Sequence, residues 1–507
     1  TMVLLVPEPM HPVGLSTLVF AAASIALVAI PRRPGVAWPV LGVLLAFMAL
    51  TKVNLGAFAV LALAVALALA TQTDTSRRPV RFAIAALVLA PFVLLLPDLA
   101  DRGPYNLLVL LWAGTAGVVA VGVGVEVRAG DRRLVRDALA LGGGAFAGAA
   151  FVLLAVTLLL GSSLSAVIDG LLVEPSKLRE VFVIAFTTPD ATVWWAVAAV
   201  VGALAVRRRP DRRLPSGPAG AAIRGVAAIA ILAAVAQASP LTFGPPSGPL
   251  PVGALLLWLL LVPPTGVERD RETLFVRTGL VLLALIEMLQ VYPVAGTQVR
   301  AASVLMIVPA GMLLGDALDE LAAWSARTQD QRGPGLLANA SNGVLAVAVA
   351  LALASIAQPL TTFVHTWGDF KPLVTSGSST LRLPPGRADG FADLARTVRR
   401  ECRALVTYPG FNSLYVWSGI APPTGLNAGT WMLLLDAEQQ QRVVDAVADE
   451  PGTCLVRNPK QAEGWLQGRP LPDRPLARFV TTQFENPRPF LDGEYELLTR
   501  IGTGGPR

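Results

Sequence analysis

The feature that most constrains the fold is a short polar break inside a long apolar run. Residues 35–50 and 56–70 are almost purely apolar, and Thr51, Lys52 and Asn54 stand between them. A lysine and an asparagine at such a place are costly unless they lie at a membrane surface or line a site. The pattern therefore predicts two membrane spans joined by a very short polar connection.

Composition extends this expectation to most of the chain. Of the 507 residues, 54% are hydrophobic and only 15% are charged. Apolar windows of roughly 15–22 residues recur along the sequence, and this length is sufficient to cross a bilayer. We predict an α-helical polytopic membrane protein with about twelve transmembrane helices. The expected spans are roughly 12–30, 36–50, 55–71, 82–97, 106–126, 137–160, 191–206, 222–238, 252–264, 275–292, 302–315 and 342–358.

Short arginine clusters occupy every second connection between these spans. A net charge of +6 arranged in this way follows the positive-inside rule and does not argue for a nucleic-acid partner. The alternation predicts that the N-terminus and Lys52 lie outside the cytoplasm. The abundance of Ala, Val, Gly, Arg and Pro is typical of a high-GC bacterium, so the bacterial plasma (inner) membrane is expected. The clusters are Arg32/Arg33, Arg77/Arg78/Arg81, Arg128/Arg132/Arg133/Arg136, Arg207 to Arg213, Arg269/Arg271/Arg277 and Arg327/Arg332.

After Pro359 the composition changes to that of a soluble domain. The chain therefore divides into a transmembrane helical domain at 1–358 and an extracytoplasmic α/β domain at 359–507. Within the second domain the apolar pattern predicts strands at 404–407, 454–457 and 494–501, and an amphipathic helix at 436–448.

Both cysteines, Cys402 and Cys454, lie in this C-terminal domain, each at the head of a predicted strand. A disulfide between neighbouring strands would suit an oxidising compartment. Two buried free thiols are the alternative. A catalytic thiol is not indicated, because the two histidines, His11 and His365, are distant in sequence.

Polar residues of the predicted outer face are the candidates for chemistry. The Lys52 ammonium, held in a short connection, suits a phosphate group, and the alternative is an ordinary surface lysine. Asp98 and Asp101 are candidate catalytic carboxylates, as a general base or as metal ligands, although they could simply solubilise a turn. A carboxylate-bound Mg²⁺ or Mn²⁺ is an open alternative for a cofactor.

A second informative segment follows the expected span at 275–292. Glu287 lies within that span, about one helical turn below its outer end, and an ionisable group there is a functional candidate. The alternative is that it reaches the surface or pairs with Arg300. Pro293 and Gly296 break the helix, so that Gln298 and Arg300 can turn toward a cavity.

Several motifs together resemble the polytopic GT-C glycosyltransferases, the membrane enzymes that use polyprenyl-phosphate sugars and include mannosyl- and arabinosyltransferases. One motif is Leu50-Thr51-Lys52 at a helix end, followed directly by another span. The others are the proline-rich segment at 7–12, the stretch at 292–298, and Asn412-Ser-Leu-Tyr415-Val-Trp417-Ser-Gly419 with the prolines after it. The resemblance covers the general plan of the chain, with many spans followed by a small outer α/β domain.

This resemblance implies a mechanism and a set of site residues. An acceptor hydroxyl on a glycan, lipid or protein attacks the anomeric carbon of the polyprenyl-phosphate sugar, a carboxylate acts as general base, and cations or a metal hold the departing phosphate. Lys52 and Arg300 would contact the donor phosphate. The residues implied for sugar or acceptor contact are His11, Asn54, Glu287, Tyr292, Gln298, Asn412, Tyr415 and Trp417.

The sequence departs from the family pattern at the essential aspartate, which lies after the first span in a large outer loop. Here Glu8 is the only acid before the first expected span, and Thr1 is not a start methionine. Three alternatives follow: the loop lies upstream and this chain lacks the N-terminal part, Glu8, Asp98 or Asp101 substitutes as the catalytic carboxylate, or the chain is not an active transferase. We favour the first.

Two other functional classes are compatible with the sequence. A lipid or sugar transporter or flippase should show internal repeats, broken helices and buried charges in several spans. A non-enzymatic membrane assembly protein would use its outer domain to bind a partner.

Overall fold

The computed structural model separates the chain into two compact units, with the division between Ala357 and Gln358. We call them the helical unit and the sheet unit. The described residues are 12–71, 103–122, 133–173, 191–209, 213–237, 250–264, 270–291, 297–332, 368–378, 381–425, 435–466 and 473–501, together with 82, 86, 93, 95, 470 and 471.

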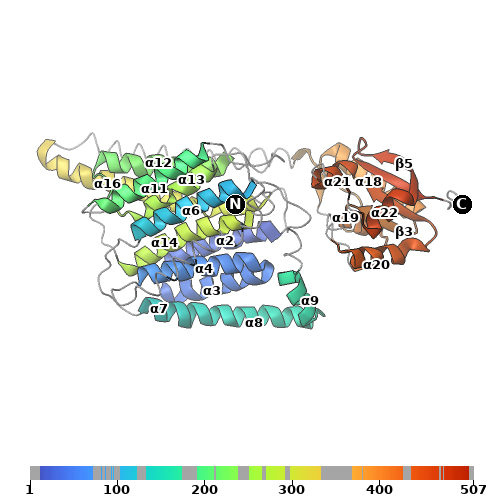
Figure 1. Cartoon of the computed structure of the whole chain (residues 1–507), viewed down its shortest axis with the longest axis horizontal. Helices are drawn as coiled ribbons and strands as arrows, with labels where there is room; N and C mark the ends of the chain where they lie inside the picture. The colour runs from blue at the N-terminus through green and yellow to red at the C-terminus, as the bar shows by residue number, and fades with distance from the viewer. Residues whose placement is uncertain are drawn as a thin grey trace. The chain divides into compact units, whose positions relative to one another are not determined.

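The helical unit consists of helices that run side by side in Figure 1. Its α-helices are α2 (Pro12–Ala29), α3 (Pro34–Thr51), α4 (Val53–Ala70), α6 (Gly103–Gly122), α7 (Arg133–Asp137), α8 (Gly144–Leu159), α9 (Leu164–Ile168), α11 (Thr192–Arg208), α12 (Pro218–Gln237), α13 (Leu250–Leu256), α14 (Arg271–Ile286), α15 (Thr297–Val304) and α16 (Ile307–Arg332). Two π-helical segments, η3 (Ala138–Gly143) and η4 (Asp169–Val173), and two 3₁₀ segments, η5 (Leu257–Leu261) and η6 (Glu287–Val291), continue neighbouring helices.

Among the described residues, six helical segments are long and apolar enough to cross a membrane. This supports a helical membrane protein. They are Pro34–Thr51, Val53–Ala70, Arg133–Leu159, Pro218–Val235, Arg271–Val291 and Ala301–Arg327.

Six of the twelve expected spans are not in this set, so the described residues support half of the expected number: 12–30, 82–97, 106–126, 191–206, 252–264 and 342–358. The one at 342–358 lies outside the described residues, as does nearly all of the one at 82–97. The expected span at 302–315 differs in a way that matters for the site. A turn at residues 305 and 306 separates α15 from α16, and α16 then continues to Arg332. The helix can continue because two of its acidic residues, Asp316 and Glu320, have partners inside the helical unit.

The polar break recognised in the sequence lies at the tip of the α3–α4 hairpin. Lys52 alone separates the two helices, and its backbone N–H donates to the Met48 carbonyl at 2.9 Å. A side chain at Gly56 would clash with the backbone of Ala49, so only glycine lets α4 pass α3 this closely. The Lys52 side chain is therefore held at the tip of a tight hairpin.

Helix α14 forms the centre of the helical unit. Twelve of its sixteen residues are buried, and it packs against α4 on one side and α6 on the other (Figure 1). Its continuation η6 contacts both α4 and α15. Helix α8, by contrast, buries none of its residues and contacts α3, as expected for a helix that faces lipid.

The sheet unit is built around a four-stranded sheet in the order β3–β4–β6–β5. Strands β3 and β4 are parallel and joined through α20, whereas β6 is antiparallel to both of its neighbours. A separate antiparallel pair, β1 with β2, precedes the sheet. The elements are β1 (Lys371–Pro372), β2 (Arg382–Leu383), α18 (Pro385–Glu401), β3 (Ala404–Tyr408), α19 (Asn412–Ser418), α20 (Ala437–Ala448), β4 (Thr453–Arg457), α21 (Pro459–Leu466), α22 (Pro475–Thr482), β5 (Phe484–Phe490) and β6 (Tyr495–Arg500).

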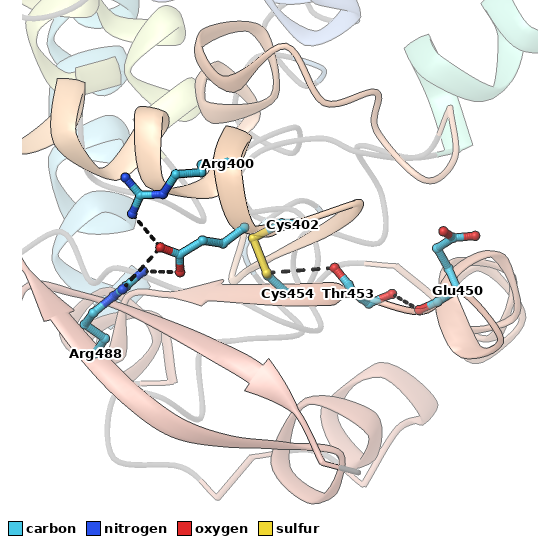
Figure 2. Close-up of a disulfide and its surroundings, with 8 residues drawn as sticks. Arg400, Cys402, Glu450, Thr453, Cys454 and Arg488 are labelled. Atoms are coloured by element: carbon cyan, nitrogen blue, oxygen red, sulfur yellow. Dashed lines mark hydrogen bonds and ion pairs between the residues drawn. A yellow bond between two sulfur atoms is a disulfide. The ribbon is translucent and has the colours of Figure 1, made fainter. Parts of the chain in front are cut away.

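Alternate residues of the strands bury two separate cores. Leu405 packs with residues of α18 and α19 on one face, and Val406 packs with residues of α20 and α22 on the other. Cys402 and Cys454 form a disulfide that ties the end of α18 to β4 (Figure 2). The sequence pattern did not reveal β5, because its prolines are unusual in strands and are tolerated here at the edge of the sheet.

Candidate functional site

An ionisable side chain without a partner lies inside the helical unit. Glu287 is fully buried, and neither of its carboxylate oxygens has a hydrogen-bond partner among the described residues. It stands where α14 tightens into the 3₁₀ segment η6. Burying a carboxylate without hydrogen bonds is expensive, so the position is a strong candidate for function.

Lys52 supplies the opposite charge. The ammonium and the Glu287 carboxylate interact electrostatically, although no hydrogen bond joins them. The hairpin explains the approach, because α4 begins directly after Lys52 and packs against η6. Lys52 itself is half-buried. An amine and a carboxyl group are thus placed near each other without a hydrogen bond between them.

Two amides belong to the same region. In a 3₁₀ helix, side chains three residues apart share one face, so Gln290 lies on the face of Glu287. Gln290 is buried, and its Nε2 has no partner among the described residues. Gln298 lies in the first turn of α15, which packs against η6. The Oε1 of Gln298 also has no hydrogen-bond partner among the described residues. We call Lys52, Glu287, Gln290 and Gln298 the unpaired cluster.

The other predicted residues of the helical unit have different outcomes. Asn54 is half-buried, and its Oδ1 accepts a hydrogen bond from the Leu55 N–H at 3.1 Å, so its amide helps to start α4. Arg300 lies in α15, two residues after Gln298, with its side chain outside the described part. The predicted residues outside the described ranges are Glu8, His11, Asp98, Asp101 and Tyr292.

Metal binding stays a prediction. Among the described residues, no group of three His, Cys, Asp or Glu side chains comes together as metal ligands. The carboxylates proposed for Mg²⁺ or Mn²⁺, Asp98 and Asp101, are not among these residues.

The predicted acceptor residues of the sheet unit all lie on α19. Tyr415 is a core residue: it is buried, and its hydroxyl donates to the Leu405 carbonyl at 3.3 Å. Its predicted contact with a sugar or acceptor stays a prediction. Trp417 is half-buried, with ring centroids 5.5 Å from Phe391 and 5.3 Å from Phe411. Asn412 is exposed, and its acceptor role stays a prediction.

A second set of buried charges was not recognised in the sequence. Arg277 had been grouped with a cytoplasmic arginine cluster, but it lies inside α14 and forms two hydrogen bonds to Asp316, at 2.6 and 2.7 Å. Asp316 belongs to the part of α16 beyond the expected end of that span. The spacing of Asp316 and Glu320, four residues apart on one helical face, is the signal that could have indicated buried partners.

Arg224 and Glu320 complete this set. Arg224 is buried and donates to the carbonyls of Val262 and Pro263 at 3.1 and 3.0 Å. Glu320 accepts a hydrogen bond from the Gly217 N–H at 2.9 Å and lies 3.9 Å from Arg224. We call Arg224, Arg277, Asp316 and Glu320 the paired network. It joins α12, α14 and α16.

Comparisons with known proteins found none that is similar to this chain. No family model matches the sequence, and searches of curated proteins and of solved structures found no match.

Proposed function

We propose that the protein is a membrane glycosyltransferase that moves a sugar from a polyprenyl-phosphate donor to an acceptor hydroxyl, with inversion. The observation that carries the proposal is the unpaired cluster. A phosphate-linked sugar requires a cation for the phosphate, a carboxylate for the acceptor proton and polar groups for the sugar hydroxyls. Lys52, Glu287, Gln290 and Gln298 supply these groups, and none of their free polar atoms is used elsewhere among the described residues.

The chemistry assigns one role to each group. The acceptor oxygen forms a bond to the anomeric carbon as the bond from that carbon to the phosphate oxygen breaks. The acceptor proton passes to the Glu287 carboxylate, and the negative charge goes to the departing polyprenyl phosphate. Lys52 neutralises that charge, assisted by Arg300, while Gln290 and Gln298 contact sugar hydroxyls. Glu287 thereby takes the base role that the sequence had suggested for Glu8, Asp98 or Asp101.

The proposal includes a location. The alternation of arginine clusters supports about twelve spans in a bacterial plasma membrane, with Lys52 and the sheet unit on the outer face. The acceptor would then be a glycan, a lipid or a protein outside the cytoplasm.

Transfer is tested with the full chain in nanodiscs and radiolabelled polyprenyl-phosphate mannose or arabinose. A charge-assisted contact is worth about 1.5–3 kcal/mol, so Lys52→Met should raise the donor KM about 10- to 150-fold. Glu287→Gln removes the base and should lower kcat about 10²- to 10⁴-fold.

Lys371→Met and Asp319→Asn, which change exposed charges elsewhere, serve as matched controls and should leave transfer unchanged. Normal transfer by Lys52→Met, or by Glu287→Gln, would remove that residue from the mechanism.

A transporter of lipid or sugar is a second candidate, and a specific feature of the helices favours it. The α-helical geometry is interrupted at η6, which begins with the buried Glu287, and again at the turn between α15 and α16. Transporters have similar discontinuous helices beside their binding sites. Proteoliposomes separate the two functions. A transporter moves the intact polyprenyl-phosphate sugar between leaflets, whereas a transferase releases polyprenyl phosphate.

A further inference from the structure

The sheet unit contains a cavity of about 340 Å³ at the carboxyl ends of its two parallel strands. Tyr408 and Arg457 are the last residues of β3 and β4, are paired in register, and both line the cavity. The carboxyl ends of parallel strands are where open α/β sheets bind ligands. The volume falls at the lower end of the range for small-molecule pockets.

The cavity has a fixed base and an apolar wall. The Asn458 N–H donates to the Tyr408 carbonyl at 2.9 Å, and its Oδ1 accepts from the Gln461 N–H at 2.9 Å, which fixes the junction between β4 and α21. The wall comes from α21, α22 and the segment before α22. Its apolar members are Pro459, Ala462, Leu466, Leu471 and Val480.

One polar side chain in the cavity is a buried tyrosine. Tyr408 is 7% exposed, and its phenol interacts electrostatically with the Arg474 guanidinium. Burial raises the pKa of Tyr408 to about 12. The phenol therefore stays neutral at physiological pH and can both donate and accept a hydrogen bond.

The charges that line the cavity are balanced. Arg457 contributes one cation and Glu463 one anion, and Arg457 is already paired with Glu496 of β6. An anionic ligand would have to approach both carboxylates. A neutral ligand with several hydroxyls fits better, because each hydroxyl donates and accepts and can use the mixed set of Arg457, Glu463, Tyr408 and Thr481. The C–H faces of a sugar ring suit the apolar wall.

We infer that this cavity is a binding site for a neutral mono- or disaccharide. The site is carried by the sheet unit alone and does not depend on the chemistry proposed for the unpaired cluster.

Saturation-transfer NMR on the full chain in nanodiscs tests the inference directly. The probes are the methyl glycosides of mannose, glucose, galactose and arabinose, with maltose as the disaccharide and hexanoate as an anionic amphiphile. Saturation transfer to at least one saccharide is expected, and Ala462→Trp, which fills the cavity, should abolish it. Tyr408→Phe removes one hydrogen bond of about 0.5–1.5 kcal/mol and should weaken binding about 2- to 12-fold.

A matched pair of variants keeps the test specific. Thr481→Val and Thr482→Val both remove a hydroxyl that donates within α22, but only Thr481 lines the cavity, so only its replacement should weaken binding.

Saccharide binding by Lys52→Met at the wild-type level would show that this site is independent of the proposed transfer reaction. The inference is overturned if no saccharide in the panel responds, if hexanoate alone responds, or if Ala462→Trp and Tyr408→Phe both bind as the wild type does.

Discussion

The paired network and the unpaired cluster both contain buried ionisable groups of the helical unit, but they differ in the hydrogen bonds of their carboxylates. In the network, both carboxylate oxygens of Asp316 accept hydrogen bonds from Arg277. In the cluster, both carboxylate oxygens of Glu287 lack such a partner among the described residues. A buried carboxylate that is hydrogen-bonded to an arginine of a neighbouring helix fixes how helices pack, whereas one without such bonds keeps its bonding capacity for a ligand. The hydrogen bonds therefore distinguish structure from function more clearly than burial does.

One helix connects the two sets. Arg277 lies in the first half of α14, and Glu287 follows its last residue. The two residues are ten positions apart, which corresponds to about 15 Å along the helix axis. With the predicted orientation, the paired network would lie toward the cytoplasm and the unpaired cluster toward the outer face. The network would then hold α14 in place so that η6 presents Glu287 at a fixed position.

Breaking the network should give the largest loss of stability. Asp316→Ala leaves Arg277 buried without its partner, and such a change costs about 3–5 kcal/mol. The measurement is the free energy of unfolding of the purified protein in detergent. Asp319→Ala removes an exposed acid of the same helix and should change this free energy by less than about 0.5 kcal/mol. Equal losses in the two variants would contradict the assignment of Asp316 to a structural pair.

Replacing both partners sharpens the same test. The double variant Arg277→Leu with Asp316→Leu removes the charges together and should recover most of the loss, to within about 1–2 kcal/mol of the wild type. The same unfolding measurement checks it. If the double variant is as unstable as Asp316→Ala, the cost does not arise from an unpaired buried charge.

An exposed pair should give the smallest effect. Lys371 donates to Asp389 at 2.6 Å, but both side chains are largely exposed. Lys371→Ala should therefore cost about 0–1 kcal/mol, and the cost should fall further at high salt. A salt titration of the unfolding free energy checks this. A loss of unfolding free energy that approaches the loss in Asp316→Ala would show that the cost of breaking an ion pair does not depend on its burial.

Much of the fold could be predicted from the sequence because apolar length and alternation are local properties. The run on each side of Lys52 predicted α3 and α4, and the alternation in 404–407 and 454–457 predicted β3 and β4. The disulfide was one of two open alternatives, because pairing depends on how the end of α18 meets β4.

The site was predicted in part, for the same physical reason. Lys52, Glu287 and Gln298 were recognised singly as polar groups in apolar surroundings. Their approach to one another depends on how η6 packs against α4 and α15, and no local pattern reports this. Gln290 was missed because its role follows from the 3₁₀ geometry of η6. The pairing of Arg277 with Asp316 was missed because an arginine near a span end resembles a topology signal.

We propose that the Glu287 carboxylate lacks a hydrogen-bond partner among the described residues because it binds a ligand, and one comparison of two variants tests this most directly. Glu287→Gln and Asp316→Asn make the same chemical change, from carboxylate to amide, in the two sets. The account predicts that the melting temperature of Glu287→Gln in detergent is equal to or higher than that of the wild type, because a buried charge without hydrogen bonds is removed. It predicts a clear decrease for Asp316→Asn. A decrease of similar size in both variants would contradict the account, because Glu287 would then be a structural partner.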